Sequence, residues 1–134
     1  MIQLIPPKKV TVKTSPGKGL GCFANSRISK DEVFEECYLL DIDQIPDVDL
    51  FKDYRFNYPH MGEFQGQVLP MGFGCIYNHN NTPNASWRDH PDWKNLEVKV
   101  FQFYALRDIY PGEEICTFYG GEDYWKYRSH VKIL

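Results

Sequence analysis

The sequence lacks the features of secreted, membrane-spanning and metal-clustered proteins. Residues 1–12 hold no apolar core of a signal peptide, and no run approaches the roughly 20 apolar residues of a membrane-spanning helix. The 4 cysteines form no C-x-x-C pair, which argues against a zinc cluster or a compact disulfide framework and favours reduced thiols. We therefore expect an intracellular protein without a metal or a membrane span, in the cytoplasm or, in a eukaryotic host, the nucleus.

An excess of positive charge is also missing. The chain has 15 Lys and Arg against 18 Asp and Glu, which gives a formal net charge of −3. Direct nucleic-acid binding usually needs a basic face and is therefore disfavoured, whereas a mildly acidic chain suits a basic peptide substrate. Solubility alone explains the same balance. The length of 134 residues predicts a single domain, residues 1–134, with one core.

Long helical patterns are scarce as well, and the sequence predicts a mainly β fold. No apolar stripe with a period of 3.6 residues appears before the C-terminus, and 9 prolines and 10 glycines separate short β-like runs. Pro111 and Gly112 predict a turn between the last two strands. Asp47 and Asp49 predict the start of a short helix that carries Tyr54 and ends before Pro59. A second helix is predicted at residues 122–130. The predicted strands are residues 10–14, 21–24, 33–42, 85–88, 97–106 and 115–119.

A glycine turn lies near the N-terminus, at Gly17, Gly19 and Gly21. The third glycine comes one residue too early for the dinucleotide-binding pattern G-x-G-x-x-G, and no βαβ unit follows. Taken alone, these glycines favour a tight turn between two strands, because glycine readily adopts positive φ.

The polar pair Asn78 and His79 follows the apolar run 71–77 directly. Residues 78–84 are rich in turn formers and, taken alone, favour a solvated loop. The apolar run would instead press the pair against the interior, where an unpartnered Asn or His costs about 1–3 kcal/mol. A polar ligand at this point is therefore reasonable. A metal is not favoured, because the 4 histidines show no H-x-H or H-E-x-x-H spacing.

Together these stretches resemble a known family. The glycine turn, Asn78 and His79 with Pro83 and Asn84, and the Gly-Glu-Glu-Ile-Cys-Thr-Phe-Tyr-Gly stretch of residues 112–120 resemble, in order and separation, the SET-domain protein lysine methyltransferases. Small stand-alone members of viruses and bacteria are the most similar kind. The resemblance covers about residues 10–128. It implies a SET fold of several small β-sheets with short helices and a C-terminal pseudoknot, with a variable insert at about 44–70 and a cofactor-closing segment at about 120–134.

The resemblance also implies an activity and its residues. The implied reaction is methyl transfer from S-adenosylmethionine to the ε-amine of a protein or peptide lysine, with a histone tail as one admissible substrate. Tyr119 matches the family's active-site tyrosine, although a tyrosine at a strand end is usually a core residue. The implied substrate-binding residues are Tyr54, Thr117 and Tyr124. The implied cofactor-binding residues are Lys18, Gly19, Leu20, Asn78, His79 and Trp125.

The sequence departs from the family motif at several positions and allows alternative functions. Asn80 and Asn81 stand where many members have Ser and Cys, and Thr117 stands where many have Tyr or Phe, so the number of methyl groups added does not follow from the motif. Tyr124 and Trp125 have nearly equal weight as aromatics that close the core. A non-catalytic SET-fold module that binds lysine-containing peptides is the main alternative, and a small-molecule methyltransferase is a weaker one. Small viral relatives are dimeric, so the resemblance allows a homodimer.

Overall fold

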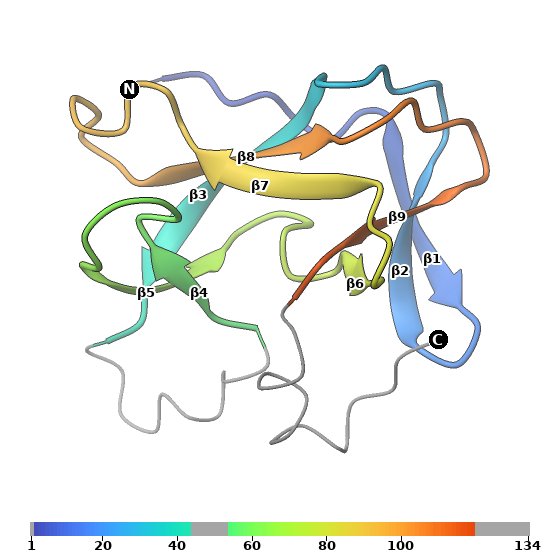
Figure 1. Ribbon diagram of the computed structural model, residues 1–134, viewed down its shortest axis with the longest axis horizontal. Coiled ribbons are helices and arrows are strands. Elements are labelled where there is room, and N and C mark those ends of the chain that lie inside the picture. The colour runs from blue at the N-terminus through green and yellow to red at the C-terminus, as the bar shows by residue number, and fades with distance from the viewer. Residues whose placement is uncertain (1, 44–53, 120–134) are drawn as a thin grey trace.

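All regular structure in the described part of the chain is β-strand (Figure 1). The computed structural model describes residues 2–43 and 54–119. Within these ranges, no helix has the length and apolar character needed to cross a membrane. The mainly β fold expected from the sequence is confirmed. The strands are β1 (Val10–Ser15), β2 (Gly19–Ala24), β3 (Val33–Asp41), β4 (Phe56–Tyr58), β5 (Gly66–Pro70), β6 (Asn78–His79), β7 (Ala85–Asp89), β8 (Val100–Ala105) and β9 (Glu114–Thr117).

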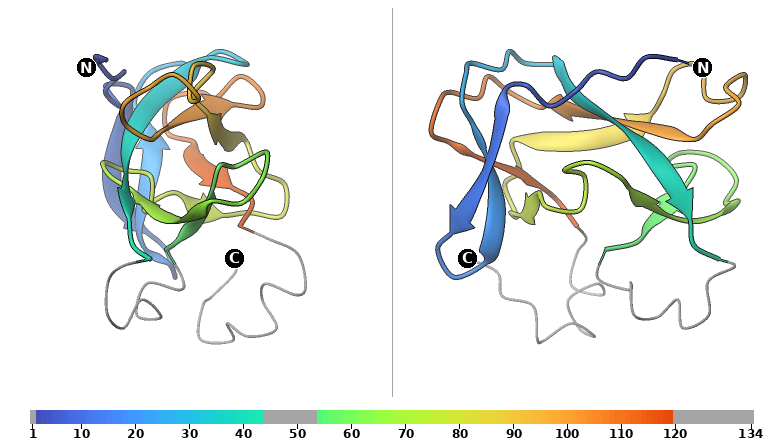
Figure 2. Two further views of the ribbon diagram at one scale, coloured as in Figure 1. Left: turned by 90° about the vertical axis from the view of Figure 1, so that its left-hand side faces the viewer. Right: turned by 180° about the vertical axis from the view of Figure 1, so that it is seen from behind.

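The strands form two sheets, which adjoin where β7 contacts β9 (Figures 1 and 2). One sheet has the order β1-β2-β9-β6, in which β6 runs parallel to β9 and the other pairs are antiparallel. The other sheet is antiparallel with the order β4-β5-β3-β8-β7. Strand β3 spans this second sheet, because its first part pairs with β8 and its last part with β5 (Figure 2).

The strands expected from the sequence all occur. The structure extends β1 and β7 by one residue and β2 by two residues at its start, and shortens β3 and β8. Strand β9 begins one residue before the predicted start and ends two residues before the predicted end. The sequence did not predict β4, β5 or β6. These are short, and β6 is only a two-residue pairing with β9.

The prediction of a helix that ends just before Pro59 is wrong where the structure describes it. Tyr54 lies in a turn, and Phe56–Tyr58 forms β4, which pairs with β5. Phe56 and Tyr58 face the core on either side of the exposed Asn57, which is the two-residue period of a strand rather than of a helix. Residues 44–53 and the predicted helix 122–130 lie outside the described residues, as does the segment expected to form the pseudoknot.

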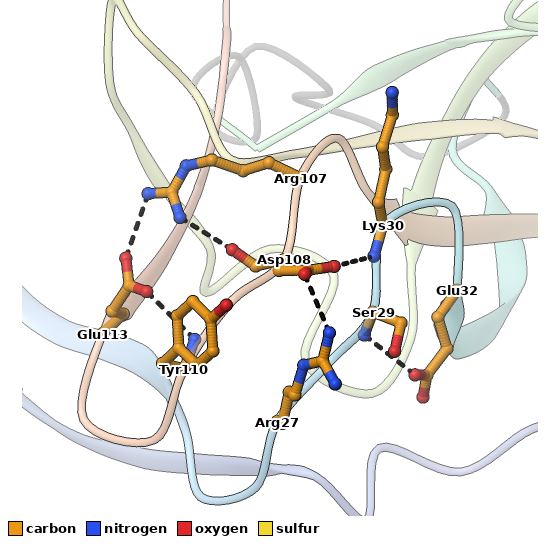
Figure 3. A network of polar contacts seen from close by, with 8 residues as sticks. All are labelled: Arg27, Ser29, Lys30, Glu32, Arg107, Asp108, Tyr110 and Glu113. Atoms are coloured by element: carbon orange, nitrogen blue, oxygen red, sulfur yellow. Dashed lines mark hydrogen bonds and ion pairs between the residues drawn. The ribbon is translucent and has the colours of Figure 1, made fainter.

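Two turns of the same design lead into β3 and β9 (Figure 3). In the first, Glu32 N–H donates to Ser29 O and Ser29 N–H donates to Glu32 Oε1, both at 3.0 Å. In the second, Glu113 N–H donates to Tyr110 O and Tyr110 N–H donates to Glu113 Oε1, again at 3.0 Å. Each glutamate thus caps its own turn, and both carboxylates are solvent-accessible.

The two turns meet at a bridge between Ile28 and Ile109, which exchange two backbone hydrogen bonds of 2.8 Å. The third residue of each turn has positive φ, 69° at Asp31 and 92° at Gly112. The turn predicted at Pro111 and Gly112 is therefore confirmed, with glycine at the position that needs its freedom. The bridge and its two turns connect both sheets.

Strand β3 departs from the usual alternation of buried and exposed residues. Residues 34–37 are all buried, and the pairing with β8 shifts between Val33 and Glu35 at a β-bulge. A bulge places an extra residue in one strand and redirects the side chains beside it. As a result the carboxylate of Glu35 lies in the core, among Phe34, Cys37 and Tyr77.

Candidate functional site

The β1–β2 hairpin carries the glycine turn that the sequence predicted. Lys18 N–H donates to Ser15 O at 3.0 Å, and Gly17 and Gly19 have φ of 76° and 84°. A Cβ built on Gly19 meets none of the described heavy atoms within 4 Å, and the neighbouring Leu20 is 58% exposed. The tip of the hairpin therefore exposes the backbone at Gly19 and the apolar side chain of Leu20, and a ligand could lie against both.

Close packing fixes the other side of the hairpin. The amide Nδ2 of Asn78 donates to Leu20 O at 3.0 Å and to Glu114 Oε2 at 2.8 Å. Ser15 Oγ donates to Glu114 Oε1 at 2.9 Å. A Cβ on Gly21 would lie 2.6 Å from Glu114 Oε2, so only glycine fits there. The Glu114 carboxylate, on β9, thus links the hairpin to β6.

Lys18 reaches across from the hairpin to β6. Its Nζ donates to His79 O at 3.2 Å. This contact and those of Asn78 bring Lys18, Leu20, Asn78 and His79 to one place, although up to 61 residues separate them along the chain. With Gly19, which lies between Lys18 and Leu20, all five implied cofactor-binding residues that the structure describes therefore lie together.

The His79 ring is buried and held by hydrogen bonds at both nitrogens. Tyr119 N–H donates to His79 Nδ1 at 2.8 Å, so the proton of the neutral ring lies on Nε2, which donates to Asn81 Oδ1 at 2.7 Å. Desolvation, with a contribution from the charge of Lys18, lowers the pKa of His79 below its usual value. The His79 ring is therefore neutral and has a fixed tautomer, and its Nδ1 positions the backbone N–H of Tyr119.

Tyr119 lies two residues after the end of β9, where it contacts both His79 and an aromatic cavity. Its ring contacts the His79 ring with centroids 5.4 Å apart, and its hydroxyl donates to the carbonyl oxygen of Tyr77. Its side chain also lines the cavity. One residue therefore connects the surface of Lys18, Asn78 and His79 with the cavity.

The cavity has a volume of about 320 Å³ and mostly aromatic walls. Phe56 packs edge-on against Trp87 with ring centroids 4.8 Å apart, and the His60 ring lies 5.2 Å from Trp87. Burial lowers the pKa of His60, which favours its neutral form. Such walls disfavour a charged amine and favour a neutral one. The lining residues are Tyr54, Arg55, Phe56, Asn57, His60, Gly74, Cys75, Tyr77, Trp87 and Tyr119.

The implied substrate-binding residues have different positions. Tyr54 lines the cavity and is 54% exposed. Thr117 is buried, pairs with His79 across β6 and β9, and is not among the described residues that line the cavity. Tyr124 and Trp125 lie outside the described residues. Sequence reasoning missed Arg55, His60 and Trp87 as well as Glu35 and Tyr77. Arg55 and His60 flank β4, and Glu35 follows the β3 bulge, neither of which was predicted. Trp87 lies on a predicted strand, but no sequence signal indicated the face to which it contributes.

The cysteines are not part of a metal or redox centre in the described part of the chain. All 4 are free thiols, and no group of three or more described His, Cys, Asp or Glu side chains could hold a metal ion. Burial raises the pKa of Cys22 to about 12 and that of Cys75 and Cys116 to about 11. The thiols stay protonated and unreactive at neutral pH, as the sequence suggested.

Comparisons with known proteins point to one family. The model of the SET domain matches residues 19–120. A Schizosaccharomyces pombe histone-lysine N-methyltransferase specific for H3 lysine 37 is 35% identical over 54 residues, which are 40% of this chain and 33% of that protein. The chain thus matches about a third of the length of this curated relative. The crystal structure of a Plasmodium falciparum protein described as a candidate histone methyltransferase has a TM-score of 0.71 and 30% identity, and the match covers 90% of this chain and 97% of that one.

Proposed function

Because this chain belongs to the SET-domain family, we propose that it transfers a methyl group from S-adenosylmethionine to the ε-amine of a protein lysine. The observation that carries the proposal is the position of Tyr119, whose backbone binds His79 and whose ring and hydroxyl face the aromatic cavity and Tyr77. A cofactor on the hairpin side and a lysine in the cavity would meet at this residue.

The hairpin side fits S-adenosylmethionine. The cofactor supplies an electrophilic methyl group on a positively charged sulfonium. Lys18, Gly19, Leu20, Asn78 and His79 would hold it: open space beside Gly19 admits a ligand against the backbone, and Leu20 offers apolar surface. The ammonium group of Lys18 provides a positive charge for a ligand carboxylate.

The cavity suits the side chain of lysine. A free lysine has a pKa of about 10.4, so its deprotonation at pH 7.4 costs roughly 4 kcal/mol. Desolvation between Phe56, Trp87 and the tyrosines opposes the ammonium form and reduces this cost. The same aromatic faces attract a methylated ammonium by about 0.5–2 kcal/mol, which favours binding of the product as well.

Tyr119 would orient the amine. Its hydroxyl proton is donated to the Tyr77 carbonyl, while a hydroxyl oxygen that donates can still accept a hydrogen bond. An amine N–H that donates to this oxygen points the nitrogen lone pair away from it. Catalysis then consists mainly of alignment and electrostatics, without an identified general base.

A histone tail is the substrate that we propose to test first. The matched relatives are named as histone methyltransferases, and the net charge of −3 is compatible with a basic tail. Other lysine-containing proteins belong to the same test, because the cavity would hold the lysine side chain alone and would not select the residues on either side of it. The wild-type chain, incubated with a histone mixture and methyl-labelled cofactor, should place the label on lysine, as mapped by mass spectrometry.

Cofactor binding is tested separately by calorimetry. S-adenosylmethionine should bind without added zinc, and Lys18→Met should weaken its affinity about tenfold, the scale of a hydrogen bond to a charged group. Lys13→Met is a matched control, since Lys13 lies exposed on the same hairpin and contacts Phe23 instead. Peptide binding without methyl transfer would favour the non-catalytic module. No cofactor binding at millimolar concentration would remove the enzyme altogether.

A further inference from the structure

Glu35 is a carboxylate with 1% exposure that lies outside the surface and cavity described above. Its Oε1 accepts a hydrogen bond of 2.6 Å from the Tyr77 hydroxyl, and its Oε2 accepts one of 2.9 Å from Phe73 N–H. Gly72 has a φ of 88°, and a Cβ there would lie 2.5 Å from Glu35 Oε2. The chain thus turns tightly around this carboxylate, and the glycine is required for the approach.

The turn around Glu35 leads straight into the candidate site. Gly74, Cys75 and Tyr77 line the cavity, and the Tyr77 carbonyl accepts the hydroxyl proton of Tyr119. The Tyr77 ring also packs against Phe103, with centroids 5.1 Å apart. Tyr77 is therefore fixed at its hydroxyl, its ring and its carbonyl.

We propose that Glu35 is a positioning residue, which holds the segment 72–77 through Tyr77 and so places the carbonyl that directs the Tyr119 hydroxyl. A hydroxyl group rotates unless an acceptor fixes it, and this carbonyl keeps the proton of Tyr119 directed at the protein backbone. If the Glu35 contacts are lost, the Tyr77 carbonyl moves and the Tyr119 oxygen no longer faces the substrate amine in one orientation. The catalytic part of this inference rests on the proposed function.

The test variant is Tyr77→Phe, which removes the hydroxyl and keeps both the ring and the carbonyl. Turnover on a lysine peptide should fall about tenfold, because the buried hydrogen bond that fixes Tyr77 to Glu35 is lost. Affinity for S-adenosylmethionine should change less than about twofold, since none of the hairpin contacts is touched. Glu35→Gln is the second variant: its amide oxygen can still accept from Phe73 N–H, but its amide nitrogen can only donate to the Tyr77 hydroxyl oxygen. Its rate should therefore fall less than that of Tyr77→Phe, by about twofold to fivefold. Tyr110→Phe in the exposed turn is the matched control.

A double-mutant cycle separates positioning from general stability. If Glu35 and Tyr77 act through the Tyr119 hydroxyl, Tyr77→Phe combined with Tyr119→Phe should be no slower than Tyr119→Phe alone. Losses that multiply, or a Tyr77→Phe variant with the wild-type rate, would overturn the proposal. If Tyr77→Phe does not fold, Glu35→Gln takes its place in the cycle: its smaller loss of rate should disappear in the Tyr119→Phe background, and a Glu35→Gln variant with the wild-type rate would overturn the proposal.

The resonance of the Tyr119 ring reports on its position without requiring methyl transfer. With ring-labelled tyrosine, the Tyr119 resonance, identified by its absence in Tyr119→Phe, should shift in Tyr77→Phe and stay in place in Tyr110→Phe. An unmoved Tyr119 resonance in Tyr77→Phe contradicts the positioning role even if the enzyme is active. An inactive wild-type chain contradicts the proposed function, while the resonance still decides whether Glu35 and Tyr77 position Tyr119.

Discussion

Two regions of the molecule each combine a glutamate with a tyrosine. Glu35 and Tyr77 are in contact in the core, whereas Glu113 and Tyr110 form a turn at the surface. In each, a glutamate accepts a backbone N–H, from Phe73 at 2.9 Å and from Tyr110 at 3.0 Å. Each carboxylate also has a stronger donor, the Tyr77 hydroxyl at 2.6 Å in the core and the Arg107 guanidinium at 3.0 Å at the surface (Figure 3).

The pKa values of the two carboxylates shift in opposite directions, and the causes differ. Desolvation raises the pKa of Glu35, whereas the hydrogen bond from Arg107, followed by that from Tyr110 N–H, lowers the pKa of Glu113. An exposed ion pair contributes about 0–1 kcal/mol, while a buried polar group that loses its partner costs about 1–3 kcal/mol. Substitutions in the surface turn should therefore have little effect on stability. Substitutions in the contact between Glu35 and Tyr77 should affect both stability and the geometry of the site.

The largest expected difference in the free energy of unfolding is between Gly72→Ala and Gly112→Ala. Both have positive φ, 88° and 92°, but a Cβ on Gly112 meets no described atom within 4 Å, whereas one on Gly72 meets Glu35 Oε2 at 2.5 Å. Gly112→Ala should cost about 1–2 kcal/mol from the left-handed backbone alone. Gly72→Ala should cost about 1–3 kcal/mol more, because the buried carboxylate must move. Denaturant unfolding measures both, and equal losses would contradict the tight packing around Glu35.

The comparison also shows what could be predicted from the sequence. Strand β1 follows from local alternation, β8 from its aromatic and β-branched residues, and the turn at Gly112 from residue type. The position of Glu35 does not follow, because a glutamate in a strand is expected to face water and the β3 bulge has no local signature. The Asn78 and His79 pair could be assigned by resemblance, but its contact with Tyr119 depends on parallel pairing of β6 and β9 across 40 residues.

A smaller effect is expected in the pH dependence of stability, with opposite signs in the two regions. The raised pKa of Glu35 means that wild type gains stability over Glu35→Gln at low pH and loses it as pH rises through the folded-state pKa. Lys30 N–H, followed by Arg27, lowers the pKa of Asp108. Wild type should therefore lose its advantage over Asp108→Asn as pH falls below about 4, the usual range of Asp. Unfolding curves between acidic and neutral pH measure both slopes, and slopes of the same sign would contradict the contrast in burial.

The smallest expected effect is that of Glu113→Gln. The amide keeps an oxygen for Tyr110 N–H and loses only the charge opposite Arg107, in a pair whose side chains are 35% and 54% exposed. The loss of stability should not exceed about 1 kcal/mol and should shrink in high salt. The rate of methyl transfer should match that of the wild type. A large loss of rate in this variant would show that the surface turn acts on the site, and the distinction between the two regions would fail.

The role of Tyr119 in catalysis is tested by the single-turnover rate of methyl transfer to a lysine peptide in Tyr119→Phe. This change removes one oxygen and keeps the ring that lines the cavity. We predict a variant that folds, binds S-adenosylmethionine as the wild type does, and reacts about one to three orders of magnitude more slowly, while Tyr110→Phe keeps the wild-type rate. A Tyr119→Phe variant that binds the cofactor and methylates lysine at the wild-type rate, with the chemical step limiting, would contradict this role.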